Sequence, residues 1–196
     1  MIRLHESLPN SITVGGKRYC VDFDFRNVLK MIDILGQDDL LPETREFLAL
    51  RCVIRYPPKD TKAALSEIKK IIFPEKQTAP SEKLTDYDQD ADLIRAAFLQ
   101  SYGINLWRDR LHWLEFIGLL SSLPSGSRYA DIINIRARPM PAPTAHNQAE
   151  REWLAKAKAT HAVRLSEKEM QTMLQNSLHS TTASLLALAE KRGGKK

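Results

Sequence analysis

Four aspartates at alternate positions, Asp86, Asp88, Asp90 and Asp92, come closest to the spacing of a metal site. Alternating carboxylates open the calcium loop of an EF-hand, where oxygen ligands surround the ion. That loop also needs glycine at its sixth position and a bidentate glutamate at its twelfth, but a loop counted from Asp86 has alanine at both. We therefore expect these carboxylates to cap and stabilise the start of a following helix, and we expect no bound metal or cofactor.

His112 and Glu115 are the next pair with chemical potential, since a spacing of three residues places them on one face of a helix. No nucleophile, third ligand or glycine-rich turn accompanies them, and no two histidines have the i, i+4 spacing of metal ligands on a helix. The sequence also lacks the glycine patterns of serine hydrolases, P-loop enzymes and dinucleotide-binding enzymes. We expect His112 to be a packing residue, and we predict no catalytic residues and no enzymatic activity.

Aromatic residues gather in one region, at Phe98, Tyr102, Trp107, Trp113 and Phe116. The surrounding segment 106–123 is the most apolar of the predicted helices and is apolar on two sides. Such a helix is normally buried or covered by a partner. Two interpretations follow: core packing, or a hydrophobic groove or self-association surface. On the second interpretation, Trp107, Trp113 and Phe116 are candidate protein-binding residues.

The elements that must position these residues are mostly helices. Before them, alternating apolar residues on both sides of Gly15 and Gly16 predict a β-hairpin over 11–23. A polar segment without periodicity, 74–87, predicts a surface loop. Caps, prolines and apolar spacing predict helices over 24–36, from near Pro42 to before Tyr56, from near Thr61 to before Pro74, from the aspartates to Gly103, over 106–123, and around 132–135.

Prolines at alternate positions 139, 141 and 143 favour an extended spacer over a helix. We therefore predict a hairpin plus helical body over 1–138, a proline-rich spacer over 139–147, and a helical extension with a basic tail over 148–196. The predicted fold is mainly α, with an N-terminal β-hairpin packed on a bundle of about six helices. The last helix of the extension carries an apolar stripe, and its candidate protein-binding residues are Met170, Met173, Leu174, Leu178 and Leu185.

The chain has 196 residues and a formal net charge of +5, which raises the possibility of a nucleic-acid partner. Residues 1–146 hold 20 basic and 19 acidic side chains, whereas residues 147–196 hold 9 and 5. The positive charge therefore belongs mostly to the extension. Two scattered cysteines favour a reducing compartment, and we expect neither a signal peptide nor a membrane span.

Several of these segments together resemble a known family. The opening residues around Leu8-Pro9, the hairpin and Asp24-Phe25-Arg26 resemble the start of small phage tail-module proteins. Residues 96–106 read AAFLQSYGINL and residues 111–116 read LHWLEF. With Leu119, Leu123-Pro124 and the segment 132–136, they resemble the bacteriophage gene-product-fifteen family of phages and prophages of Gram-positive hosts. The resemblance covers about residues 8–138, so no function is transferred to the proline spacer or the basic tail.

The resemblance implies a role in tail assembly in the host cytoplasm, because genes of this family lie between those of the major tail protein and the tape measure. The implied function is a chaperone that binds apolar helical segments of the tape-measure protein before the tail tube forms. Self-association is a second expected interaction. The alternatives are a small basic nucleic-acid-associated phage protein, which the near-neutral body disfavours, and a structural component of the tail.

Overall fold

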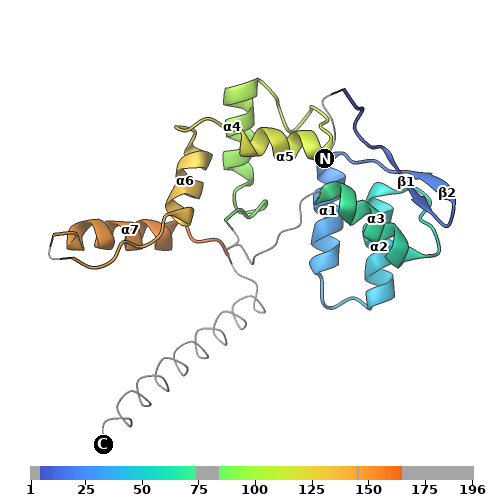
Figure 1. The fold of residues 1–196 in the computed structure, drawn as a ribbon, viewed down its shortest axis with the longest axis horizontal. Coiled ribbons are helices and arrows are strands. Elements are labelled where there is room, and N and C mark those ends of the chain that lie inside the picture. The colour runs from blue at the N-terminus through green and yellow to red at the C-terminus, as the bar shows by residue number, and fades with distance from the viewer. Residues whose placement is uncertain (1–4, 74–83, 145, 165–196) are drawn as a thin grey trace, which may run out of the picture.

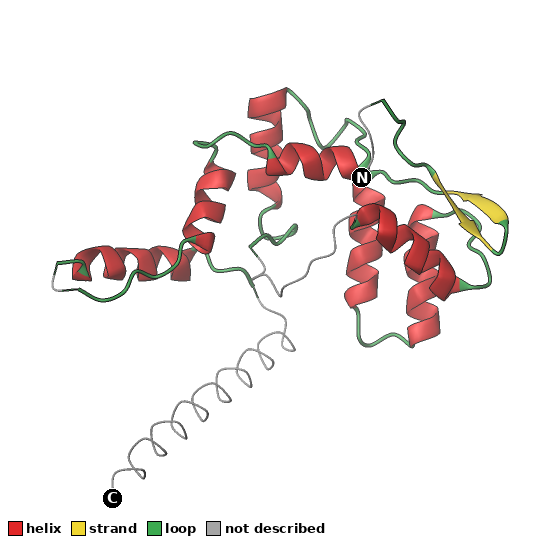
Figure 2. Cartoon of the chain, viewed as in Figure 1, coloured by secondary structure: helices red, strands yellow, loops and turns green. Residues whose placement is uncertain are grey.

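The computed structural model describes residues 5–73, 84–144 and 146–164. These ranges contain one antiparallel hairpin and seven helices. The elements are β1 (Ser11–Val14), β2 (Lys17–Cys20), α1 (Phe25–Gly36), α2 (Pro42–Val53), α3 (Thr61–Ile72), α4 (Ala91–Tyr102), α5 (Trp113–Ser121), α6 (Arg128–Ala137) and α7 (Gln148–Thr160). The hairpin and α1–α3 lie at one end of the molecule, α4 and α5 in the middle, and α6 and α7 at the other end (Figures 1 and 2). The predicted mainly α fold with an N-terminal hairpin is confirmed.

The hairpin turns at Gly15 and Gly16, whose φ angles of 55° and 74° lie in the left-handed region that glycine tolerates best. Ile12 pairs with Tyr19 across the two strands. Ile12 and Val14 are buried, and β1 packs against α3. The alternation read from the sequence therefore identifies the face of β1 that joins the core.

Local signals fix the ends of the helices around the hairpin. The Asp24 side chain accepts a hydrogen bond from the Arg26 N–H and begins α1, while Pro42 occupies the first turn of α2. Asp60 caps α3 in the same way as Asp24 caps α1. The three helices pack in sequence order, with α2 against both α1 and α3.

The helix predicted over 106–123 is wrong in its first third, because α5 begins at Trp113. The backbone around His112 bonds to residues at and just before the start of α1 instead of continuing a helix toward residue 106. The Phe25 N–H donates to the Leu111 carbonyl at 3.0 Å, and the Trp113 N–H donates to the Phe23 carbonyl at 2.7 Å. Tertiary hydrogen bonds therefore replace helical ones ahead of α5.

An aromatic cluster joins α1, α4 and α5 in the core. The Phe116 ring stacks on Phe25 of α1 and Phe98 of α4, with centroid distances of 4.6 and 5.3 Å. The indole N–H of Trp113 donates to the Ile72 carbonyl at 3.1 Å, so it is satisfied inside the core. Burial of these rings connects the hairpin, α1–α3, α4 and α5 into one hydrophobic core.

A buried ion pair holds the other end of the molecule together. Arg136 of α6 donates to both carboxylate oxygens of Asp90, at 2.6 and 2.8 Å, and also to the carbonyls of Leu84 and His161. Leu154 of α7 is fully buried, and α7 packs against α6. Residues 139–143 between these helices are non-helical, and the domain boundary placed there stays a prediction.

Candidate functional site

Trp107 is the most exposed tryptophan, with 71% of its surface accessible. It lies in a turn that side chains at both ends hold in place. The Asn105 side-chain oxygen accepts from the Trp107 N–H at 3.0 Å, and the Asp109 carboxylate accepts from the Asn105 N–H at 2.7 Å. Short polar side chains that bond to the nearby backbone favour a turn over a helix, which accounts for the late start of α5.

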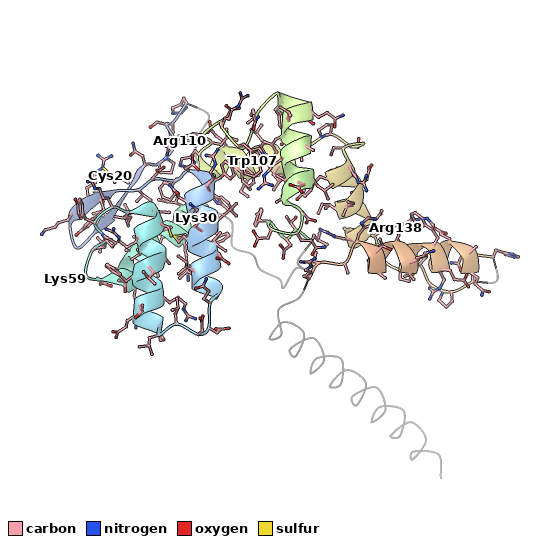
Figure 3. All side chains as sticks on the ribbon, turned by 180° about the vertical axis from the view of Figure 1, so that it is seen from behind. Cys20, Lys30, Lys59, Trp107, Arg110 and Arg138 are labelled. Carbon is pink, nitrogen blue, oxygen red and sulfur yellow. The ribbon has the colours of Figure 1, made fainter. Side chains whose placement is uncertain are left out.

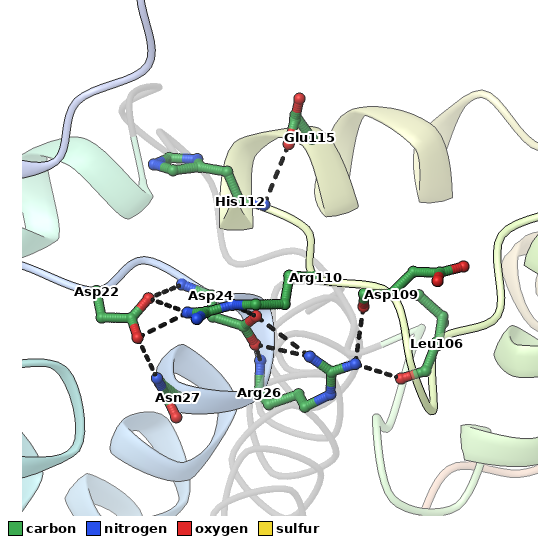
Figure 4. Close-up of polar contacts among 9 residues, drawn as sticks. All are labelled: Asp22, Asp24, Arg26, Asn27, Leu106, Asp109, Arg110, His112 and Glu115. Carbon is green, nitrogen blue, oxygen red and sulfur yellow. Dashed lines mark hydrogen bonds and ion pairs between the residues drawn. The ribbon is translucent and has the colours of Figure 1, made fainter.

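Arg26 fastens this turn to α1. Its guanidinium donates to the carbonyls of Leu106 and Asp109, each at 2.8 Å, and it pairs with Asp24 at 3.2 Å (Figure 4). The planar guanidinium offers several donors in fixed directions, so one side chain can bind two carbonyls and a carboxylate. Trp107 is therefore positioned from α1, outside its own segment.

A second arginine ties the end of the turn to the chain segment between β2 and α1. Arg110 donates to both carboxylate oxygens of Asp22 at 2.8 Å and to Asp24 at 3.1 Å (Figure 4). Donating hydrogen bonds to the Asp22 carboxylate raises the pKa of Arg110 above its usual value. Asp24 thus caps α1 and also accepts from Arg26 and Arg110, so one carboxylate links the helix start to the turn.

A pocket of about 290 Å³ lies beside this turn, between α1 and α4. Apolar side chains form most of its wall. Figure 3 shows Trp107 between α1 and α4, and Lys30 on α1. The lining residues are Phe25, Arg26, Leu29, Lys30, Tyr87, Asp88, Ala91, Ile94, Arg95, Leu106, Trp107 and Phe116. We call this the α1–α4 pocket.

The polar part of the α1–α4 pocket is mainly cationic. The guanidinium of Arg95 lies 4.0 Å from the centre of the Trp107 ring, within the range of a cation–π interaction. Lys30 and Arg26 add positive charge, and Asp88 is the single carboxylate of the lining. Burial raises the pKa of Tyr87 to about 12, so its hydroxyl is neutral at physiological pH.

His112 and Glu115 form a helix cap. The His112 Nδ1 accepts from the Leu114 N–H at 3.1 Å, and the Glu115 carboxylate accepts from the His112 N–H at 3.1 Å (Figure 4). The other ring nitrogen then carries the proton and donates to the Pro9 carbonyl at 2.9 Å. This reciprocal arrangement is a capping box with histidine in the place usually taken by serine or threonine, so both side chains stabilise the start of α5.

The four aspartates have different roles. Asp86 accepts from the N–H groups of Asp88 and Gln89, and Asp92 pairs with Arg95 at 2.9 Å. The expected capping of α4 is wrong for Asp86, which accepts from residues ahead of the helix, and for Asp90, whose side chain makes no cap hydrogen bond and pairs with buried Arg136. Asp92 lies in the first turn of α4, as expected. Within the described ranges, no group of three or more His, Cys, Asp or Glu side chains is arranged to hold a metal ion.

The candidate protein-binding residues fall into three groups. Trp107 is exposed beside the α1–α4 pocket. Trp113 and Phe116 are only 2% and 1% exposed, so the prediction that they are surface residues is corrected: Trp113 packs in the core at a tilted angle to Phe116, and Phe116 forms part of the pocket wall. The remaining candidates lie outside the described residues; they are Met170, Met173, Leu174, Leu178 and Leu185.

Sequence reasoning missed the charged half of the pocket. Lys30 falls on the polar side of a typical amphipathic helix, and Arg95 follows Asp92 as an ordinary i, i+3 pair. Neither pattern indicates a site, because the two residues line one pocket only when α1 packs near α4. The Asn105 and Asp109 side chains were a usable signal, since they favour a turn at Trp107.

Comparisons with known proteins give one match. The sequence model described as "Bacteriophage Gp15 protein" matches residues 4–163, more than half of the chain. No curated protein and no solved structure matches. Among the residues that the structure describes, no helix is both long enough and apolar enough for a membrane span.

Proposed function

Because the chain belongs to the bacteriophage Gp15 protein family, we propose that this phage protein acts in tail assembly, as a chaperone that binds the tape-measure protein. It binds apolar helical segments non-covalently and releases them when the tail tube forms. The role is non-enzymatic and belongs to the host cytoplasm. The α1–α4 pocket is the observation that carries the proposal, since it combines an apolar wall with an exposed tryptophan.

The physical argument starts from the partner. A long helical protein with apolar stripes aggregates while those stripes remain uncovered. A groove between helices can receive such a stripe, with anchoring side chains spaced along one helical face. Tryptophan is enriched at the centres of protein interfaces because it buries a large area with few rotatable bonds. Trp107 therefore has the residue type and the exposure of an interface anchor.

The non-enzymatic role agrees with how the polar side chains are used. His112 and Glu115, the pair with the clearest catalytic potential, both bond to the backbone at the start of α5. Asp90 forms a buried ion pair with Arg136. These groups stabilise helix ends and contacts between helices, which suits a binding protein.

Co-expression with the tape-measure protein encoded in the same phage genome tests the proposal. We expect the tape-measure protein to become more soluble and to co-purify with this chain. Absence of both effects would contradict the chaperone function. Mass spectrometry of purified phage particles adds a second criterion, because a chaperone is absent from the finished tail, whereas a structural tail component is present in stoichiometric amounts.

A further inference from the structure

We propose that the α1–α4 pocket receives an apolar side chain from a helical partner segment, and that a carboxylate flanking this side chain pairs with Arg95 and Lys30. This inference rests on the proposed function, because it specifies which segments of a helical partner the protein recognises. The preference for apolar segments flanked by carboxylates is a separate claim. It can fail even if the protein binds the tape-measure protein.

The size of the pocket sets the scale of its occupant. A volume of about 290 Å³ lies just below the range for small-molecule sites, roughly 300–1,000 Å³. Its wall includes Phe25, Leu29, Ile94 and Leu106, so its interior favours an apolar group. One or two side chains of a helix laid across the opening satisfy both conditions.

The charges beside the pocket opening determine which partner residues are favoured next to the inserted apolar side chain. Asp24 offsets the positive charge of Arg26, because this carboxylate has a side chain only 6% exposed and lies 3.2 Å from the guanidinium. Lys30 is exposed, and none of the ion pairs found among the described residues includes it. A carboxylate of a partner therefore meets a cation whose charge is still available.

Arg95 is also available to a partner, although it forms a surface ion pair. Its intramolecular partner Asp92 has a side chain that is 98% exposed, and such solvated pairs contribute little free energy. Stacking on Trp107 holds the Arg95 guanidinium at the pocket while leaving its donors able to change partner. A basic partner segment lacks this complementarity, since it would bring positive charge to Arg95 and Lys30.

Two labelled synthetic peptides provide the test. Both are about 16 residues long, enough for a marginal helix, and both carry the same leucine stripe. One has glutamates flanking the central leucine, and the other has lysines at the same positions. Fluorescence anisotropy measures binding of each peptide to the full-length protein. We expect the acidic peptide to bind roughly tenfold more tightly, with a preference that falls as salt rises.

Charge reversal gives the decisive comparison. In the double variant Lys30→Glu and Arg95→Glu, we expect the preference to invert in favour of the lysine peptide. The matched control is Lys59→Glu with Lys62→Glu, which changes the net charge equally. Neither control lysine lines the pocket, and Lys59 lies well away from Trp107 (Figure 3). The control is expected to keep the preference of the wild-type protein.

Three outcomes would overturn the inference. They are equal binding of both peptides by the wild-type protein, an unchanged preference in the double variant, and an effect of charge reversal on self-association alone, which would make a second copy the occupant. If the double variant does not fold, Lys30→Glu alone repeats the test at an exposed position.

Co-purification of the tape-measure protein together with no peptide preference would reject the inference and leave the proposed function standing. Peptide preference without binding of the tape-measure protein would reject the proposed function and leave the inference about the pocket standing.

Discussion

Trp107 leaves most of its ring in solvent, and its contact with Arg95 is worth about 0.5–1 kcal/mol at an exposed site. Replacing it by alanine is therefore expected to reduce the free energy of unfolding only slightly. The same change removes the exposed anchor beside the α1–α4 pocket, so we expect Trp107→Ala to lose co-purification of the tape-measure protein.

Trp153→Ala is the matched control for this prediction, because Trp153 is also a half-exposed tryptophan, 56% accessible, but lies on α7 away from the pocket lining. Urea denaturation of each variant separates stability from binding. Equal losses of binding in the two variants would show that Trp107 has no special role.

Asp90 and Arg136 form the most buried ion pair described, with side chains 2% and 6% exposed. Removing one partner of such a pair leaves an uncompensated charge inside the protein, which costs about 3–5 kcal/mol. We therefore expect Asp90→Asn to lower the free energy of unfolding by roughly 3 kcal/mol, as measured by urea denaturation.

Asp92→Asn tests whether burial is the cause, since Asp92 pairs with Arg95 at the surface. Its expected loss is at most about 1 kcal/mol. A double replacement by apolar residues, Asp90→Leu with Arg136→Met, is expected to recover part of the loss because no charge stays unpaired. Similar losses for both Asn variants would contradict this account.

Two glycines, one at the end of α4 and one inside α5, are expected to have opposite effects on helix stability. Gly103 ends α4 with a φ angle of 68°, a left-handed conformation that costs other residues about 1–2 kcal/mol. Gly118 lies inside α5 with no positive φ and open space around its Cα. We expect Gly103→Ala to destabilise the protein and Gly118→Ala to stabilise it by about 0.5–1 kcal/mol. Thermal melts of the two variants should shift in opposite directions, and a shift in the same direction would refute the assignment.

The start of α5 depends on His112. His112→Ala removes an acceptor for the Leu114 N–H and a donor to the Pro9 carbonyl, so we expect a loss of about 1–2 kcal/mol. His112→Asn is expected to recover only part of this loss, because asparagine is a favoured N-cap residue but has a shorter side chain than the one that contacts Pro9. Equal stability of all three proteins in chemical denaturation would remove the capping role.

At the scale of the molecule, one continuous core among the described residues runs from the hairpin to Tyr129 of α6. Such a core favours one cooperative unfolding transition. A variant with Trp107→Phe and Trp153→Phe keeps Trp113, a core residue that contacts the end of α3, as the single tryptophan reporter. We expect its fluorescence transition to coincide with that of far-UV circular dichroism. A separate, earlier loss of helical signal would show that α6 and α7 unfold independently.

The sequence determined the elements whose signals are local. Asp24 and Pro42 mark helix starts, Gly103 marks a helix end, and the paired glycines mark the hairpin, because each acts on backbone groups within a few residues. The family also follows from the sequence, since it depends on residue types along the chain. Only the tertiary structure decided how the Trp107 turn is attached to α1, the pairing of Asp90 with Arg136, and the cationic side of the α1–α4 pocket. Each of these needs groups from separate elements to meet, and the hydrogen bonds from Arg26 and the burial of Asp90 exist only after the helices pack.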